Sequence, residues 1–205
     1  LILESLAIPA GGHWLDACAG AGGKTLQLAQ LLGPSGRVEA HDIRPAALQE
    51  LAIRAKRAGL PVSHLLNDKG PWRVALLDGL PAAGQLYDGV LVDAPCTGSG
   101  TWRRAPHLKW TTSAGQVTQA AEKQLALLGQ FAAFVRPGGQ LVYATCSLSG
   151  LENEEVVLAF LARHTEFAAE PPARAFGATP RAAGLAILPA QHNTDVFFVA
   201  SLRRH

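Results

Sequence analysis

Short apolar runs alternate with longer amphipathic stretches along most of the chain. Unbroken apolar runs such as 90–92 are typical of strands covered on both faces of a parallel sheet. Between them, apolar residues recur every three or four positions, which is the period of a helix. The runs that predict strands are His13–Cys18, Arg37–Asp42, Val62–Leu66, Tyr87–Asp93, Gln140–Cys146, Leu185–Leu188 and Val196–Leu202. This alternation predicts a doubly wound α/β sheet.

The predicted helices cover about 24–32, the stretch after Pro45, 117–135 and a segment ending near Arg163. Ser149 and Glu152 have the spacing of a capping box for the last of these helices. Residues 94–113 form a long loop, and loops of this length are usually functional or disordered. Two segments rich in Gly and Pro or Ala, 69–86 and 165–184, predict mixed and irregular structure.

The composition excludes several classes of protein. The chain has 205 residues, of which 48% are hydrophobic and 17% are charged, so a disordered chain is excluded. Three cysteines cannot form a disulfide framework, which favours a reducing cytoplasm. No apolar run reaches the roughly 18 residues of a membrane span, so no membrane partner is expected. The net charge of +2 neither requires nor forbids a nucleic acid. Because the chain lacks methionine and starts in an amphipathic segment, we expect a piece of a longer protein.

The loop after the first predicted strand is rich in glycine. A phosphate-binding Walker loop would need glycine where Cys18 stands, and a dinucleotide fingerprint would need glycine in place of Thr25. The remaining interpretation is a loop of small residues that a ligand can approach closely. Asp42 ends the second predicted strand, 22 residues after Gly20, where a carboxylate can bind both hydroxyls of a ribose. The pattern therefore favours a nucleoside-bearing cofactor, with a tight turn and a solvated carboxylate as the alternative.

Two further cysteines follow neighbouring predicted strands. Cys96 lies in Asp-Ala-Pro-Cys and Cys146 in Thr-Cys-Ser, and both are flanked by small or polar residues. Open α/β sheets bind ligands at the carboxyl ends of their strands. A free cysteine is most often a small buried hydrophobe, an interpretation that suits Cys18 better than the other two. The chain has no Cys-x-x-Cys pair and no His-x-x-x-His pair, so no metal site is predicted.

These motifs together resemble the RNA (cytosine-5)-methyltransferases, the class of the bacterial ribosomal small-subunit methyltransferase B and the eukaryotic Nop/Sun proteins. The segments that carry the likeness are 16–25, 93–96, 145–147 and, as the last core strand, 195–202. The resemblance implies a Rossmann-like methyltransferase fold with a mainly parallel sheet of about seven strands and helices on both faces. Residues 1–205 would be the catalytic domain, and an amino-terminal RNA-binding part of the parent protein would be absent.

The resemblance also implies a reaction and a set of site residues. S-adenosylmethionine would methylate carbon 5 of a cytidine after a thiolate has added to carbon 6. Cys146 would be the nucleophile and Cys96 would help to release the product, although DNA cytosine methyltransferases use the Pro-Cys cysteine as nucleophile. Asp93 would orient the base and touch the cofactor, Asp42 would bind the ribose, and Asp68 would lie near the adenine. The remaining residues expected against the cofactor are Cys18, Ala19, Gly20, Ala21, Gly22, Gly23 and Lys24.

The long loop after Cys96 carries the clearest nucleic-acid signal. Cationic groups bind phosphates and aromatic rings stack on unpaired bases, and the loop offers Trp102, Arg103, Arg104, Lys109 and Trp110. The expected partner is ribosomal RNA, with tRNA as the alternative. By contrast, Arg54, Lys56 and Arg57 are predicted to form a solvated helix face. Two other functions are considered: a methyltransferase acting on another substrate, and a non-catalytic RNA-binding module.

Overall fold

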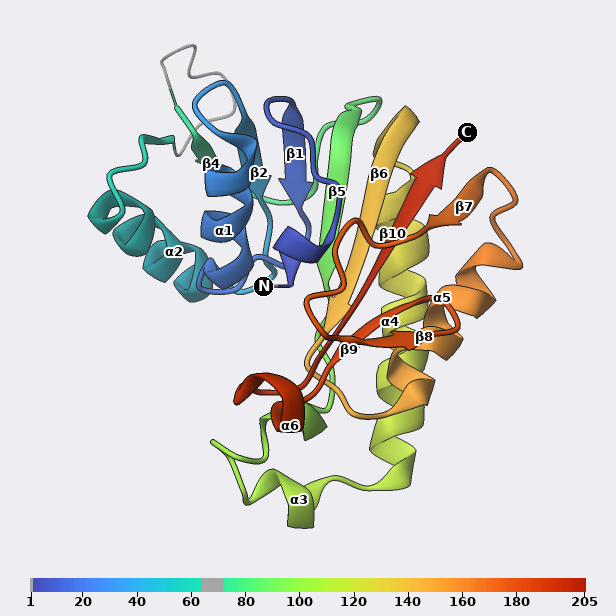
Figure 1. The fold of residues 1–205 in the computed structure, drawn as a ribbon. Helices are drawn as coiled ribbons and strands as arrows, with labels where there is room; N and C mark the ends of the chain where they lie inside the picture. Colours follow the sequence, from blue (N-terminus) through green and yellow to red (C-terminus); the bar gives the residue numbers. More distant parts are fainter. Residues whose placement is uncertain (1, 64–71) are drawn as a thin grey trace.

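A computed structural model describes residues 2–63 and 72–205, and a single large sheet runs through them (Figure 1). Within the described ranges the sheet has ten strands. Their bounds are β1 (His13–Asp16), β2 (Arg37–Ala40), β3 (Val62–Ser63), β4 (Val74–Leu76), β5 (Tyr87–Asp93), β6 (Val135–Thr145), β7 (Phe167–Glu170), β8 (Thr179–Arg181), β9 (Gly184–Ile187) and β10 (Phe197–Arg204). The predicted α/β class is confirmed, whereas the predicted number of about seven strands is too low.

The strand order is β3-β4-β2-β1-β5-β6-β10-β9-β8, with β7 paired to β10 outside this path. The six strands from β3 to β6 pair in parallel. β10 pairs antiparallel with β6, β7 and β9. The carboxyl ends of the parallel strands therefore lie along one edge of the sheet, where open α/β sheets bind their ligands.

The additional strands are short and lie in segments whose composition does not predict strands. β4 falls within residues 69–86, and β7 and β8 fall within residues 165–184. β8 contains Pro180, which an edge strand tolerates because one side of its backbone needs no partner. Of the predicted strand 62–66, only the first two residues lie in the described part of the chain.

Two predicted element boundaries are wrong. β6 begins at Val135, where it pairs with Tyr87, and not at the predicted Gln140; its register then shifts, so 137–139 forms an irregularity inside the strand. Ser149 makes no side-chain cap, and Glu152 is the buried last residue of a 3₁₀ turn (Gly150–Glu152) that precedes the helix. Spacing alone could not separate a capping glutamate from a buried one.

Helices cover both faces of the sheet (Figure 1). α1 (Gly23–Leu32) and α2 (Pro45–Arg57) pack on one face, and α4 (Ala114–Ala132) and α5 (Glu154–Leu161) pack on the other. Successive strand residues serve opposite cores, since Trp14 belongs to the first core and Leu15 to the second. This two-sided burial explains the unbroken apolar runs in the central strands.

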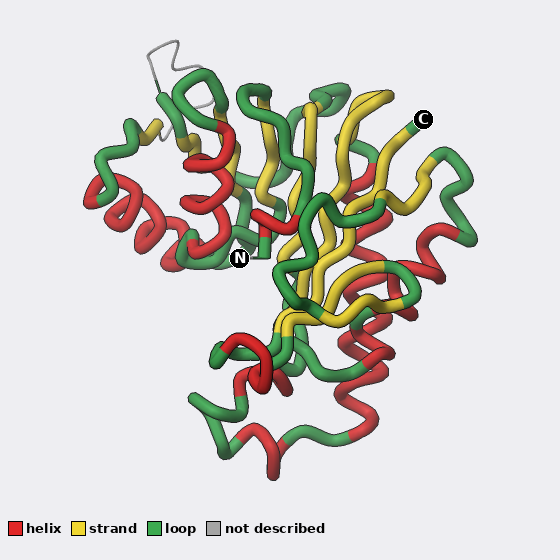
Figure 2. Tube along the Cα trace, viewed as in Figure 1, coloured by secondary structure: helices red, strands yellow, loops and turns green. Residues whose placement is uncertain are grey.

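Loops gather below the carboxyl ends of the parallel strands, together with α3 (Leu108–Thr111) and α6 (Pro189–His192) (Figure 2). The loop predicted over 94–113 is therefore partly helical, because it contains α3 and a 3₁₀ turn (Ser99–Thr101). Among the described helices, none combines the length and the apolar character that crossing a membrane requires.

Close packing of β1 against β5 depends on Gly89. A Cβ atom at this position would lie 2.4 Å from ring atoms of Trp14, whose side chain is almost fully buried. We therefore expect Gly89→Ala to lower the free energy of unfolding by about 1–3 kcal/mol, as overpacking in cores typically does. Urea titration measures this change. Gly115→Ala is the matched control, because a Cβ atom there meets nothing closer than 4.0 Å. Equal stability of the Gly89 variant and the parent would contradict this packing.

Candidate active site

A cavity of about 900 Å³ opens where the carboxyl ends of β1, β2, β5 and β6 meet. It collects most of the residues that the sequence singles out. Those that line it are Cys18, Ala19, Gly20, Ala21, Gly23, Lys24, Asp42, Asp93, Cys96, Arg104 and Cys146. Asp68 lies outside the described residues. Five predicted site residues do not line this cavity, namely Gly22, Trp102, Arg103, Lys109 and Trp110.

The glycine loop closes one side of the cavity. Gly20 and Gly22 adopt positive φ angles of 51° and 84°, which only glycine adopts easily. Gly22 is buried, and a Cβ atom on it would lie 2.7 Å from Leu51 Cγ. Its role is therefore the close packing of α1 against α2. The Arg54 guanidinium donates to the Ala21 carbonyl oxygen at 2.7 Å, so the predicted solvated face is wrong for Arg54.

Asp42 is hydrogen-bonded to the glycine loop, and its side chain is largely shielded from solvent. One of its oxygens accepts the Gly20 N–H at 2.8 Å, and the other accepts the Arg44 N–H at 2.9 Å. The Arg44 guanidinium also donates to both oxygens, at 2.9 and 3.0 Å. Its hydrogen bonds lower the pKa of Asp42, which is therefore an anion at neutral pH. The Asp42 side chain is only 5% exposed, whereas that of Arg44 is 67% exposed.

A lysine and a carboxylate face each other across the floor of the cavity. Lys24 Nζ lies 2.7 Å from Asp93 Oδ2 and 5.4 Å from the centre of the Phe197 ring. Burial raises the pKa of Asp93, and the nearby ammonium group of Lys24 opposes this shift. Burial also raises the pKa of Asp16, to about 7, although the Thr25 hydroxyl donates to it at 2.7 Å. The fully buried Asp16 and the half-buried Asp93 both lie near Lys24, so its ammonium group partly offsets the rise in the pKa of each acid.

The two cysteines of the predicted motifs are in contact. Cys96 Sγ and Cys146 Sγ lie 3.3 Å apart, at the ends of the neighbouring strands β5 and β6. A hydrogen bond from the Cys96 thiol lowers the pKa of Cys146, and the nearby Lys24 acts in the same direction. The same hydrogen bond, together with burial, raises the pKa of Cys96. Burial raises the pKa of Cys18 to about 12. The geometry therefore favours Cys146 as the thiolate of the three.

The side chains of the basic loop after Cys96 lie in different environments. Arg104 lines the main cavity and pairs with Asp195, with Nη2 2.5 Å from Oδ2. Arg103 donates to the backbone and side-chain oxygens of Asn193, at 3.0 and 2.8 Å. Trp102 and Lys109 line a separate cavity of about 290 Å³. These four side chains therefore do not line a single cavity.

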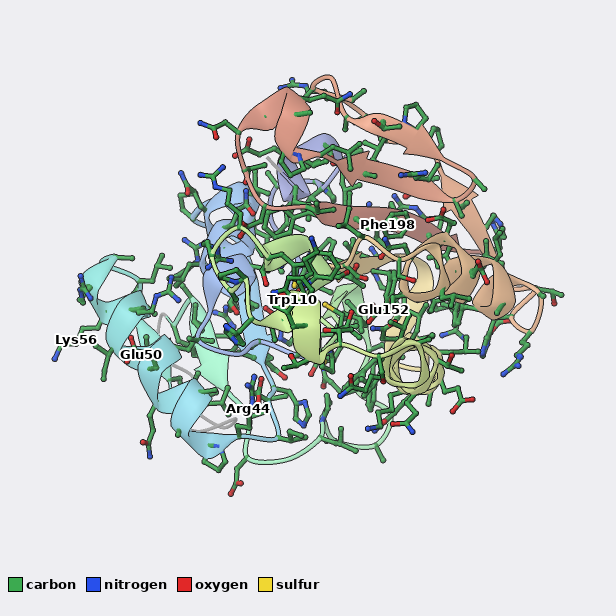
Figure 3. All side chains as sticks on the ribbon, turned by 90° about the horizontal axis from the view of Figure 1, so that it is seen from below. Arg44, Glu50, Lys56, Trp110, Glu152 and Phe198 are labelled. Atoms are coloured by element: carbon green, nitrogen blue, oxygen red, sulfur yellow. The ribbon has the colours of Figure 1, made fainter. Side chains whose placement is uncertain are left out.

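Trp110 is the most exposed aromatic residue of this loop, with 81% of its surface accessible. Seen from the side of the strand ends, it lies near the middle of the molecule, while Glu50 and Lys56 on α2 lie at the periphery (Figure 3). Lys109 Nζ lies 5.4 Å from its ring centre. The pair offers an open aromatic face beside a positive charge, which suits a nucleobase.

Several residues of the site carry no clear signal in the sequence. Cavity-lining residues that the sequence analysis misses include Gln27, His41, Ile43, Arg44, Thr194 and Phe197. His41, Ile43 and Arg44 surround Asp42, so proximity to a predicted strand-end carboxylate was the available signal. Glu152 is also missed, since its spacing from Ser149 predicts a helix cap. Among the described residues there is no group of three or more His, Cys, Asp or Glu suited to a metal ion.

Comparisons with known proteins find relatives that match nearly the whole chain. A Bacillus subtilis protein named probable ribosomal RNA small subunit methyltransferase B is 36% identical over 197 residues, which are 93% of this chain and 42% of the relative. A Vibrio cholerae ribosomal RNA small subunit methyltransferase B is 35% identical over 208 residues, which cover 100% of this chain and 44% of the relative. The chain thus spans less than half the length of these curated relatives.

Comparison with solved structures also finds a methyltransferase with the same fold. The crystal structure of NSun6 from Pyrococcus horikoshii with SFG, an S-adenosylmethionine analogue, superposes with a TM-score of 0.81 at 29% identity. The match covers 98% of this chain and 50% of that protein. The Rossmann-like methyltransferase fold implied by the sequence motifs is confirmed. The family model described as 16S rRNA methyltransferase RsmB/F matches residues 4–203, and the chain belongs to this family.

Proposed function

We propose that this chain transfers a methyl group from S-adenosylmethionine to carbon 5 of a cytidine in RNA, with small-subunit ribosomal RNA as the expected substrate. The observation that carries the proposal is the pair of thiols 3.3 Å apart at the cavity, of which Cys146 has the lowered pKa. Carbon 5 of cytosine is a poor nucleophile until a thiolate adds to carbon 6. A site for this chemistry needs one thiolate nucleophile and a second group that completes the elimination.

The cavity fits the proposed cofactor. Its volume of about 900 Å³ is in the range of small-molecule and cofactor sites. Asp42, anionic and beside the glycine loop, would accept the ribose hydroxyls, and Arg44 would have to share or release the carboxylate. Ile43 is 88% exposed and lines the cavity next to Asp42, so its apolar side chain would cover a face of the adenine. When bound, S-adenosylmethionine supplies an electrophilic methyl group. That Asp68 lies near the adenine stays a prediction, because Asp68 lies outside the described residues.

The side chains at the other end of the cavity would carry out the covalent steps. The Cys146 thiolate would form a bond to carbon 6, and carbon 5 would then take the methyl group from the cofactor sulfur, which leaves S-adenosylhomocysteine. Cys96, once deprotonated, would assist the elimination by taking the proton from carbon 5, so that the bond between carbons 5 and 6 becomes double again and Cys146 leaves carbon 6 as a thiolate. Asp93, held by Lys24 at 2.7 Å, would hydrogen-bond the polar edge of the base. Since the thiols must remain reduced, we expect the enzyme to act in the cytoplasm.

RNA would reach this site past the loop after Cys96. Arg104 lines the cavity and is 68% exposed, so its guanidinium can meet a phosphate of the target nucleotide. Trp110 and Lys109 offer a stacking face for a neighbouring base. The target cytidine must be unpaired or flipped out to reach Cys146. Trp102 and Arg103 would support the loop, because Arg103 is bonded to Asn193 and Trp102 Nε1 is buried.

Substitution of Asp42 tests the cofactor site. We expect Asp42→Ala to weaken S-adenosylmethionine binding roughly ten- to hundredfold, because charge-assisted hydrogen bonds of about 1.5–3 kcal/mol are lost. Isothermal titration calorimetry measures this change. Glu50→Ala is the control, since Glu50 is an exposed acid on α2 outside the cavity. Equal affinities of the Asp42 variant and the parent would remove Asp42 from the site.

Separate substitution of the two cysteines tests the covalent mechanism. Cys146→Ala should abolish methylation and form no adduct, because no thiolate reaches carbon 6. Cys96→Ala should still attack and transfer the methyl group, so a protein–RNA adduct that survives denaturation should accumulate. Denaturing electrophoresis after incubation with RNA and cofactor separates these outcomes. An adduct in Cys146→Ala and none in Cys96→Ala would reverse the two roles. Unchanged activity in both variants would refute the covalent mechanism.

A further inference from the structure

Glu152 is a fully buried carboxylate whose four described hydrogen-bond donors are neutral. Oε1 accepts the Thr97 backbone N–H at 2.8 Å and the Gln124 amide at 3.0 Å. Oε2 accepts the Thr97 hydroxyl at 2.6 Å and the Ser147 hydroxyl at 2.5 Å. A buried carboxyl group needs hydrogen-bond partners, and here they use both of its oxygens.

The donors come from both cysteine loops. Thr97 directly follows Cys96, and Ser147 directly follows Cys146. One carboxylate therefore holds the residue next to each thiol, although the two cysteines lie 50 positions apart in the chain. The position of Glu152 near the middle of the strand-end face is visible in Figure 3.

A second set of contacts fixes Glu152 itself. Its backbone carbonyl oxygen accepts the Tyr143 hydroxyl at 2.6 Å, and this hydroxyl also lies 3.1 Å from the Gln124 side-chain oxygen. Gln124 donates to the Pro95 carbonyl oxygen at 3.0 Å, so the segment before Cys96 is held as well. Gln124 and Tyr143 are fully buried. Side chains locked in this way can hold reacting groups to the tolerance that catalysis needs.

Other contacts join the same loops without Glu152. The Gly100 N–H donates to the Cys146 carbonyl oxygen at 2.9 Å, and the Leu148 N–H donates to the Ser99 hydroxyl at 2.8 Å. The loops should therefore stay together when Glu152 is altered, while the positions of the thiols become less restricted. Glu152 is absent from the described residues that line the cavity, so it can affect the reaction only through its neighbours.

We propose that Glu152 is a positioning residue that holds the Cys96 and Cys146 loops so that their two thiols remain in contact. Its effect on methylation rests on the proposed function, but its effect on the distance between the thiols does not. An amide in place of the carboxylate would keep the volume, lose one acceptor oxygen and turn an N–H₂ group towards the donors. The thiol contact should then be populated for less of the time.

The test measures the thiol contact directly and without RNA. Dibromobimane becomes fluorescent when both of its arms react with thiols, and mass spectrometry identifies the Cys96–Cys146 bridge. We expect Glu152→Gln to slow this bridging about tenfold or more, and to lower kcat on RNA on the order of ten- to hundredfold, since a misplacement of about 1 Å can cost a hundredfold. KM for S-adenosylmethionine should not change. Glu155→Gln is the control and should match the parent, because Glu155 is an exposed acid on α5, the helix that follows the 3₁₀ turn of Glu152.

Thermal unfolding shows whether the Glu152 variant is folded. If it is not, Thr97→Val decides, because it removes only the hydroxyl at 2.6 Å and keeps the backbone hydrogen bond to Glu152. Slower bridging in a folded variant supports the proposal, and bridging equal to that of Glu155→Gln overturns it. If the parent chain methylates no RNA while Glu152→Gln still slows bridging, the positioning role stands and the proposed function fails.

Discussion

The register between β5 and β6 is the constraint on which the site depends. Asp93 pairs with Ala144 at the end of this parallel ladder, and the Ala94 N–H donates to the Ala144 carbonyl oxygen at 2.9 Å. The two cysteine loops therefore leave the sheet side by side. A slip of one residue would turn every side chain of a strand to the opposite face and separate the thiols. The shift in register lies between Tyr87 and Gly89, at the amino-terminal ends of the two strands, and the pairing is regular from Gly89 to Asp93.

Burial then sets the chemistry of the groups that this register brings together. Burial raises the pKa of Asp16 and of Asp93. The contact between the thiols acts on both partners, because a proton kept on Cys96 can be donated to a Cys146 thiolate. In the proposed reaction this contact would prepare Cys146 as the nucleophile and Cys96 as the proton carrier, although their chemical groups are identical. The Glu152 hydrogen bonds would keep this unequal pair in contact.

Local sequence patterns predict those elements that neighbouring residues determine, such as the central strands. The predicted strand Tyr87–Asp93 is observed with the same bounds, since an unbroken apolar run ended by a carboxylate leaves little alternative. The adjacency of Cys96 and Cys146 follows from their places after neighbouring strands. Arg104 and Asp195 are 91 positions apart, and no local pattern can pair them. The prediction from spacing that Glu152 caps a helix is wrong, because the burial of Glu152 comes from tertiary packing, which local spacing does not report.

The most direct measurement is the rate of iodoacetamide alkylation of each cysteine as a function of pH, followed by peptide mass spectrometry on the ligand-free chain. Cys146 should react first, with a midpoint below the ordinary thiol value of about 8.5, while Cys96 and Cys18 should stay protected to higher pH because their pKa values are raised. Cys96→Ala should move the Cys146 midpoint upwards, since the thiolate then loses its hydrogen-bond donor. Faster alkylation of Cys96 than of Cys146, or an unchanged Cys146 midpoint in that variant, would contradict the division of roles between the two thiols.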